Sequence, residues 1–116
     1  MTTTDKKELQ QVLYTAYQAQ FVANPSTHLV VEGFPRSANT YCVECIKRSA
    51  LLGNNSINIA HHTHDIRNVE LAQHFGLPVL ILIRDPVSAI SSYSLYMNFS
   101  FDKSARIYTV FYRRLL

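Results

Sequence analysis

The sequence predicts an α/β domain in which a parallel sheet lies between layers of helices. Three short apolar runs, at 29–33, 56–60 and 78–83, have the length of buried strands. Stretches with the apolar spacing of helices separate these runs, which is typical of parallel strands joined by crossover helices. In addition, a tight loop at 33–40 joins the first strand directly to a helix. We therefore expect a three-layer fold whose strands end at one edge of the sheet.

The composition limits the classes of protein to which this chain can belong. Its 116 residues are 47% apolar and 16% charged, which fits a single globular domain over 1–116. The net charge of +3 gives no support for a nucleic-acid partner. No apolar stretch is long enough to span a membrane, and the first residues are not a signal peptide. Two cysteines and five histidines suit a reducing compartment, so we expect a cytoplasmic protein.

The first 24 residues are predicted to form an amphipathic helix. Apolar residues recur at helical spacing between Lys6 and Val22, and Asn24-Pro25 is expected to close the helix. We expect this helix to pack against the rest of the domain, because aromatic residues at such spacing are usually part of a core.

The loop after the first strand has the features of an anion site. Gly33 and Pro35 interrupt the strand, and a helix begins shortly afterwards. The first turn of a helix has unpaired N–H groups, and its dipole favours negative charge. Arg36 adds a permanent cation, and Ser37 and Thr40 add hydroxyl donors. The loop is therefore predicted to hold a phosphate-like group.

The spacing of this loop is that of the Walker A pattern G-x-x-x-x-G-K-[ST], but the lysine is absent. Gly33 is followed by four residues and then by Ala38-Asn39-Thr40, while the positive charge lies at Arg36. No convincing acid for a magnesium ion follows elsewhere in the chain. The loop is thus P-loop-like without being suited to a magnesium-bound triphosphate. The alternative is an ordinary strand-to-helix turn, with Ser37 and Asn39 as caps.

A helix is predicted from Tyr41 to Leu52, where Gly53 stops it. Cys42 and Cys45 lie one turn apart on this helix and form a C-x-x-C sequence. A redox pair is one interpretation, because a helix N-terminus lowers the pKa of a thiol. However, the tryptophan and the Gly-Pro pair of thioredoxin-like sites are missing. We therefore expect both cysteines to be small buried hydrophobic residues.

Three histidines follow the second strand, in the segment His61-His62-Thr63-His64-Asp65. A zinc site with Cys42 and Cys45 is one interpretation, but the spacing is not that of a zinc finger, so we expect no metal. Their position at the end of a strand favours another role, because open α/β sheets bind their ligands there. A histidine at this edge can act as a base near neutral pH.

The third strand lies in Leu77–Ile83, the most hydrophobic run of the chain. Its apolar and β-branched composition predicts a central strand that is buried on both faces. A helix from Ile66 to Phe75 precedes it, with Gly76 as the C-cap.

A second anion site is predicted directly after this strand. Arg84 lies at its carboxyl end, and Asp85 and Pro86 have the places of the cap and first residue of a new helix. Ser92 lies two turns into that helix, where its hydroxyl can assist Arg84 in binding an anion. The alternative is that Arg84 only pairs with a carboxylate.

Together, these motifs resemble those of the PAPS-dependent sulfotransferases. Pro35–Tyr41 resembles the family loop P-[KR]-S-[GA]-[TN]-[TS]-[WY]. Arg84-Asp85-Pro86 and Ser92 resemble the second family motif, R-[ND]-P with a serine eight positions after the arginine. His62-Thr63-His64 stands between them, where the cytosolic enzymes have K-T-H. The motifs occur in the family order and cover positions 29 to 99.

The resemblance implies a P-loop NTPase-like sulfotransferase fold that binds 3′-phosphoadenosine 5′-phosphosulfate (PAPS) and needs no metal. It implies that Arg36 lies beside the transferring sulfuryl group and that Arg84 and Ser92 bind the 3′-phosphate. His64 would be the base that takes the proton of a small-molecule or carbohydrate acceptor, with His62 as the alternative. The 5′-phosphosulfate would be held by Arg36 and by the loop residues Ser37, Ala38, Asn39, Thr40 and Tyr41.

This chain also departs from the family pattern. Arg36 replaces a lysine, His62 stands where the cytosolic enzymes have a lysine, and Ala38 replaces a glycine. Family members continue beyond the helix predicted over Ser104–Leu116, with an R-K-G-x-x-G motif. We therefore expect the N-terminal portion of the fold only, with apolar surface exposed where the remainder would pack. The alternative function is a P-loop-like nucleotide or phosphate binder without transfer activity, such as a kinase-like relative.

Overall fold

A three-stranded parallel sheet forms the centre of the molecule, an α/β domain that the computed structural model describes over residues 3–115. The strands are β1 (Leu29–Gly33), β2 (Ile59–His61) and β3 (Val79–Leu82), in the order β2-β1-β3. β1 pairs in parallel with both neighbours, so that Val30 lies opposite Ala60 on one side and Val79 on the other. The predicted parallel arrangement is therefore confirmed.

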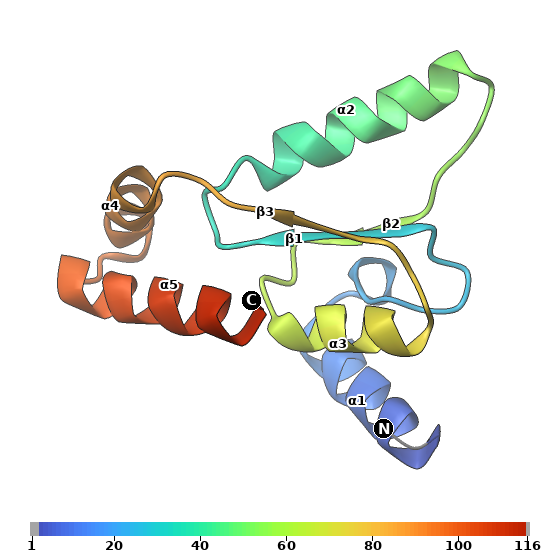
Figure 1. The fold of residues 1–116 in the computed structure, drawn as a ribbon, viewed down its shortest axis with the longest axis horizontal. Helices are drawn as coiled ribbons and strands as arrows, with labels where there is room; N and C mark the ends of the chain where they lie inside the picture. The colour runs from blue at the N-terminus through green and yellow to red at the C-terminus, as the bar shows by residue number, and fades with distance from the viewer. Residues whose placement is uncertain (1–2, 116) are drawn as a thin grey trace.

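Helices lie on both faces of this sheet (Figure 1). Helix α2 (Asn39–Leu52) covers one face, and α3 (Ile66–His74) covers the other, with α1 (Thr3–Ala16) packed beneath α3. Helices α4 (Pro86–Met97) and α5 (Phe101–Leu115) pack on each other beside the carboxyl ends of the strands, at the left of Figure 1. No helix within residues 3–115 has the length and apolar character that crossing a membrane requires.

The core divides between the two faces of β1, because successive side chains of a strand point to opposite sides. Val30 is completely buried and packs in one cluster with Leu71 of α3 and Leu13 of α1. Val31, also completely buried, packs with Val43 of α2 on the opposite face. Each of these side chains contributes about 1.5–3 kcal/mol on burial, and together they hold α2 and α3 against the strand.

Local signals place most helix ends as predicted. Gly53 follows the last residue of α2, and Gly76, with a φ of 65°, lies two residues beyond α3. Asp85 caps α4 by accepting a hydrogen bond from the N–H of Ser88, and Pro86 is the first helical residue. These ends depend on residues within the same turn, which explains why the sequence alone predicts them.

The N-terminal helix is shorter than the predicted one. Helix α1 ends at Ala16, and a short 3₁₀ turn, η1 (Ala19–Phe21), follows it. The buried amide of Asn68 in α3 accepts a hydrogen bond from the N–H of Ala23 and donates one to the carbonyl of Phe21. These long-range bonds hold the segment in a non-helical form that its own apolar spacing does not predict.

Strand β3 is an edge strand of the sheet that residues 3–115 form, so the prediction of a central strand buried on both faces is wrong. The chain crosses from β2 through α3 to the far side of β1, which gives β1 the central place. Leu80 of β3 remains 38% exposed and Ile83 remains 60% exposed. Exposed apolar side chains are also present on α4 and α5, at Leu95, Tyr96, Met97, Phe101 and Val110. That a further part of the fold packs on them stays a prediction.

Some smaller expectations also differ from the structure. Helix α5 starts at Phe101 rather than at Ser104, and α2 starts at Asn39 rather than at Tyr41. Strand β2 starts at Ile59 rather than at 56, because the N–H of Asn58 donates to the ring of His28 instead of to a neighbouring strand. The cysteines are not buried: Cys42 is half-buried and Cys45 is exposed, and both are free thiols. Cys42 packs at the edge of the core cluster that contains Val31 and Val43, whereas Cys45, one turn further along α2, lies outside that cluster.

Candidate functional site

The loop between β1 and α2 has an unusual backbone. Arg36 and Ala38 both have left-handed conformations, with φ angles of 71° and 65°. Left-handed residues alternating with ordinary ones turn successive N–H groups toward one side, which forms an anion-binding concavity. Neither residue is a glycine, so each left-handed conformation costs about 1–3 kcal/mol. Such strain at a loop that opens a helix is typical of a functional site.

The polar side chains of this loop do not cap the helix. Ala38 is the N-cap residue of α2, and no side chain caps the helix there, so the alternative of an ordinary turn capped by Ser37 or Asn39 is wrong. Ser37 and Asn39 are nevertheless buried, and the Ser37 hydroxyl and the Asn39 amide oxygen make no hydrogen bond. A buried polar group without a partner costs about 1–3 kcal/mol. An oxygen of a bound anion would give the Ser37 hydroxyl an acceptor.

Gly33 allows the loop to start close to the neighbouring strand. A Cβ atom on Gly33 would lie 2.8 Å from the carbonyl oxygen of Leu82 and 3.1 Å from the amide oxygen of Asn39. Any side chain would therefore push β1 away from β3 at the point where both strands end. This close approach brings the loop and the residues after β3 to one place.

A cavity of about 740 Å³ opens at this edge of the sheet. Both predicted cations, Arg36 from the loop and Arg84 from the end of β3, lie on its wall, as do His62 and His64 from the end of β2. The other lining residues are Pro35, Ala38, Asn39, Thr40, Tyr93, Tyr96 and Met97. The structure thus brings together on one cavity the three motifs that lie far apart in the sequence.

Hydrogen bonds tie the two arginines into one network. Arg84 donates from Nη1 to the carbonyl of Arg36 over 2.9 Å, and Arg36 donates from Nε to the hydroxyl of Ser92 over 3.0 Å. The guanidinium of Arg36 also lies 5.4 Å from the centroid of the Tyr96 ring. Ser92 therefore contacts Arg36 directly and Arg84 only through Arg36. Neither of the two ion pairs between described residues involves Arg84, which favours the interpretation of an anion site over that of a simple ion pair.

The histidine segment adopts a strained backbone between β2 and α3. The strand ends at His61, and both His62 and His64 are left-handed, with φ angles of 60° and 53°. The ring of His62 lies 3.0 Å from the hydroxyl of Thr40. Burial, together with the positive charges of His64 and Lys47, lowers the pKa of His62, so its ring is neutral at neutral pH.

The hydrogen bond of His64 identifies which ring nitrogen is free. Its Nδ1 lies 2.8 Å from the carbonyl oxygen of Gly33. A carbonyl can only accept, so in the neutral ring Nδ1 carries the proton and Nε2 has the lone pair. His64 thereby has the tautomer of a general base, on a ring that lines the same cavity as Arg36.

His64 also lines a second, smaller cleft of about 390 Å³ between the start of α3 and α5. Its wall is mainly apolar, with contributions from Ile66, Val110 and Phe111. Arg106 and Arg114 lie on the same wall. The ring of His64 therefore stands between a cationic cavity and an apolar cleft.

Three of the predicted site residues do not line the main cavity. Tyr41 points to solvent with 75% of its surface exposed, because its place in the first turn of α2 directs it away from the loop. Ser37 is buried behind the loop, and Ser92 reaches the site only through its bond to Arg36. No group of three or more His, Cys, Asp or Glu side chains within residues 3–115 is arranged to hold a metal ion.

Sequence reasoning missed two groups of residues at this site. Helix α4 forms one side of the cavity with Tyr93, Tyr96 and Met97. The spacing of these residues on one helix directly after Arg84 could have indicated that they line the site. Glu32 lies beneath the site, completely buried, and binds the histidine segment. A single acid within an otherwise apolar strand was the signal for Glu32.

Comparisons of the chain with protein-family models, with curated proteins and with solved structures gave no match.

Proposed function

We propose that this chain binds PAPS and forms the donor-binding part of a sulfotransferase with the P-loop NTPase-like fold of that family. One observation carries the proposal: the loop with Arg36, the second arginine Arg84 and the base-like His64 line one cavity at the ends of three parallel strands. Each of the three motifs that resemble those of the PAPS-dependent enzymes contributes residues to this wall. Two separated cations suit a ligand with two separated anionic groups.

Different residues of the cavity would bind different groups of PAPS. The left-handed loop and the hydroxyl of Thr40 would bind the 5′-phosphosulfate, with Arg36 beside its sulfuryl oxygens. Arg84 would bind the 3′-phosphate, since only one of its donors is used by the carbonyl of Arg36. PAPS supplies an electrophilic sulfuryl group when it is bound. Fixed cations and N–H groups then stabilise the charge that develops on the bridging oxygen, without a metal.

His64 would accept the proton of the acceptor hydroxyl at Nε2, because its Nδ1 proton is committed to Gly33. The acceptor, a small molecule or carbohydrate, would approach from the apolar cleft on the other side of the ring. The free thiols of Cys42 and Cys45 suit the cytoplasmic location that we propose with this function.

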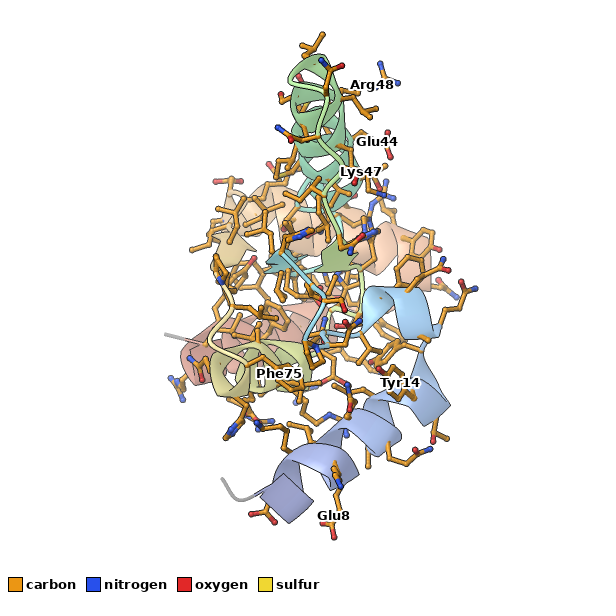
Figure 2. All side chains as sticks on the ribbon, turned by 90° about the vertical axis from the view of Figure 1, so that its right-hand side faces the viewer. Glu8, Tyr14, Glu44, Lys47, Arg48 and Phe75 are labelled. Atoms are coloured by element: carbon orange, nitrogen blue, oxygen red, sulfur yellow. The ribbon has the colours of Figure 1, made fainter. Side chains whose placement is uncertain are left out.

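Isothermal titration calorimetry with adenosine 3′,5′-bisphosphate tests the donor site. We expect this ligand to bind at least tenfold more tightly than ATP, and we expect Arg36→Ala and Arg84→Ala each to weaken binding at least tenfold. Arg48→Ala removes the same charge from α2 (Figure 2), at a residue that does not line the cavity, and should change affinity less than twofold. Equal binding of ATP would instead favour a nucleotide binder without transfer activity.

A further inference from the structure

Glu32 is the only acidic residue of the described chain that is completely buried. Its carboxylate lies on β1, one residue before the loop that opens the candidate site. Four donors converge on it from the elements around: the backbone N–H of Thr63 at 3.3 Å, the Thr63 hydroxyl, the backbone N–H of His64 at 3.1 Å and the amide of Asn68 at 3.0 Å. A carboxylate can only accept, so its ionised form satisfies all four donors.

These bonds hold the part of the chain that carries the histidines. The left-handed conformations of His62 and His64 persist only where the surroundings impose them. Two consecutive N–H groups of this segment end on the Glu32 carboxylate. The Thr63 hydroxyl donates to Glu32 and accepts from the N–H of Asp65, which fixes the direction of that hydroxyl and links Glu32 to the start of α3.

The side chain of His64 is held from the same strand. Glu32 accepts from its backbone N–H, and the next residue, Gly33, accepts from its ring Nδ1. Both anchors of His64 thus come from adjacent residues of β1, which leads directly into the anion-binding loop. The orientation of the histidine and the position of the loop are fixed by one strand.

We propose that Glu32 is a positioning residue that holds His64 with Nδ1 on Gly33 and Nε2 facing the cavity. This inference rests on the proposed function only in taking His64 as the base. The proposed action requires a carboxylate rather than an amide. A glutamine at this position would turn its NH₂ group toward N–H and O–H donors and leave at least one of them unpaired, at a cost of about 1–3 kcal/mol.

The donors around Glu32 act on its charge as well as on the histidine segment. Burial is the largest effect on the pKa of Glu32 and raises it, while the hydrogen bonds from Thr63, Asn68 and His64 act in the opposite direction by favouring the carboxylate. Loss of one of these donors would therefore raise the pKa of Glu32 further.

The test is the ¹⁵N NMR spectrum of the His64 imidazole at pH 8, in the chain without ligand. We expect a single neutral tautomer with the proton on Nδ1 in the wild type, and in Glu32→Gln a mixture in which both nitrogens carry the proton part of the time. Thr63→Val removes one donor and keeps the carboxylate, so we expect a smaller change in the tautomer populations of His64. This variant provides the test if Glu32→Gln does not fold. Tyr17→Phe, which removes a bond to Asp65 but none to Glu32, should leave the tautomer unchanged.

Binding of adenosine 3′,5′-bisphosphate separates positioning from general damage. In Glu32→Gln its affinity should stay within threefold of the wild type, while sulfuryl transfer should lose at least tenfold in kcat with little change in the donor KM. An unchanged His64 tautomer in folded Glu32→Gln and Thr63→Val would overturn the proposal. Failure of the wild type to bind the bisphosphate would contradict the proposed function instead, because the tautomer measurement needs no ligand.

Discussion

At the scale of the residue, the site depends on side chains whose backbones are strained. Arg36 and Ala38 of the loop have left-handed conformations, and so do His62 and His64 of the segment after β2. The buried Ser37 hydroxyl has no acceptor in this arrangement. Strain and an unpaired polar atom both lower the stability of the free protein, and a bound anion would compensate for the second of them.

Ala38 provides a direct measure of this strain. Replacing it by glycine removes the Cβ that disfavours a φ of 65°, so we expect Ala38→Gly to raise the free energy of unfolding by about 1 kcal/mol. Urea denaturation followed by circular dichroism would measure the change. Ala105→Gly, in the interior of α5, should have the opposite effect and lower stability by about 1 kcal/mol. Destabilisation by both changes would show that Ala38 is not strained.

At the scale of the element, the start of α4 and the bounds of β1 could be predicted because their causes are local. Asp85 and Pro86 cap α4 from within its own first turn, and the run at 29–33 has the bounds of β1. The end of α1 and the place of β3 could not be predicted in this way. The first depends on Asn68, more than forty residues away, and the second depends on the path of α3 across β1.

The candidate site could likewise be predicted only in part. Arg36, Arg84 and His64 could be predicted to converge, because the carboxyl ends of parallel strands meet at one edge. The bond of Ser92 to Arg36 rather than to Arg84, and the exposure of Tyr41, depend on how side chains turn within α4 and α2. The pattern of apolar residues in the sequence does not predict these side-chain directions.

Helix α3 begins with a charged cap whose contribution depends on pH. Asp65 accepts hydrogen bonds from the backbone and side chain of Arg67 and from Tyr17. Burial acts to raise the pKa of Asp65, but the bonds from Arg67 and Tyr17 outweigh it and hold the pKa below 3.8. An acid with a lowered pKa stabilises the folded state above its unfolded pKa, and this stabilisation is lost as the pH falls through the folded value.

We therefore expect Asp65→Ala to lower the free energy of unfolding by about 1–2 kcal/mol at pH 7. The difference from the wild type should shrink as the pH falls below 3.8, because the unfolded chain then takes up a proton at Asp65 before the folded chain does. Thermal unfolding of the two proteins at several pH values would measure this. A constant difference between pH 7 and pH 3 would mean that the charge of Asp65 contributes nothing to the cap.

At the scale of the whole molecule, one strand connects stability and function. The buried β1 joins both layers of the core through Val30 and Val31, carries the loop at its carboxyl end and holds the histidine segment through Glu32. Exposed apolar side chains instead lie on elements around it, among them Leu80 of β3, Leu95 of α4 and Leu52 of α2. Protonation of groups that pack against the sheet should therefore affect the stability of the entire domain.

His61 is the group for which this effect should be largest. It lies at the end of β2 with its ring 4.9 Å from that of Phe21, and burial, with the positive charges of His62 and Lys47, lowers its pKa to about 4. Below its ordinary value of 6.5, the unfolded chain takes up a proton at His61 while the folded chain does not. The free energy of unfolding should therefore fall as the pH decreases from 6.5 to about 4.

His61→Gln removes this titration and keeps a polar side chain. We expect the variant to be less stable than the wild type at pH 7.5, because the ring contact with Phe21 is lost, and to approach or exceed the stability of the wild type near pH 4. Chemical denaturation at half-unit pH intervals would follow the two curves. Parallel curves for the wild type and His61→Gln between pH 6.5 and 4 would contradict the prediction.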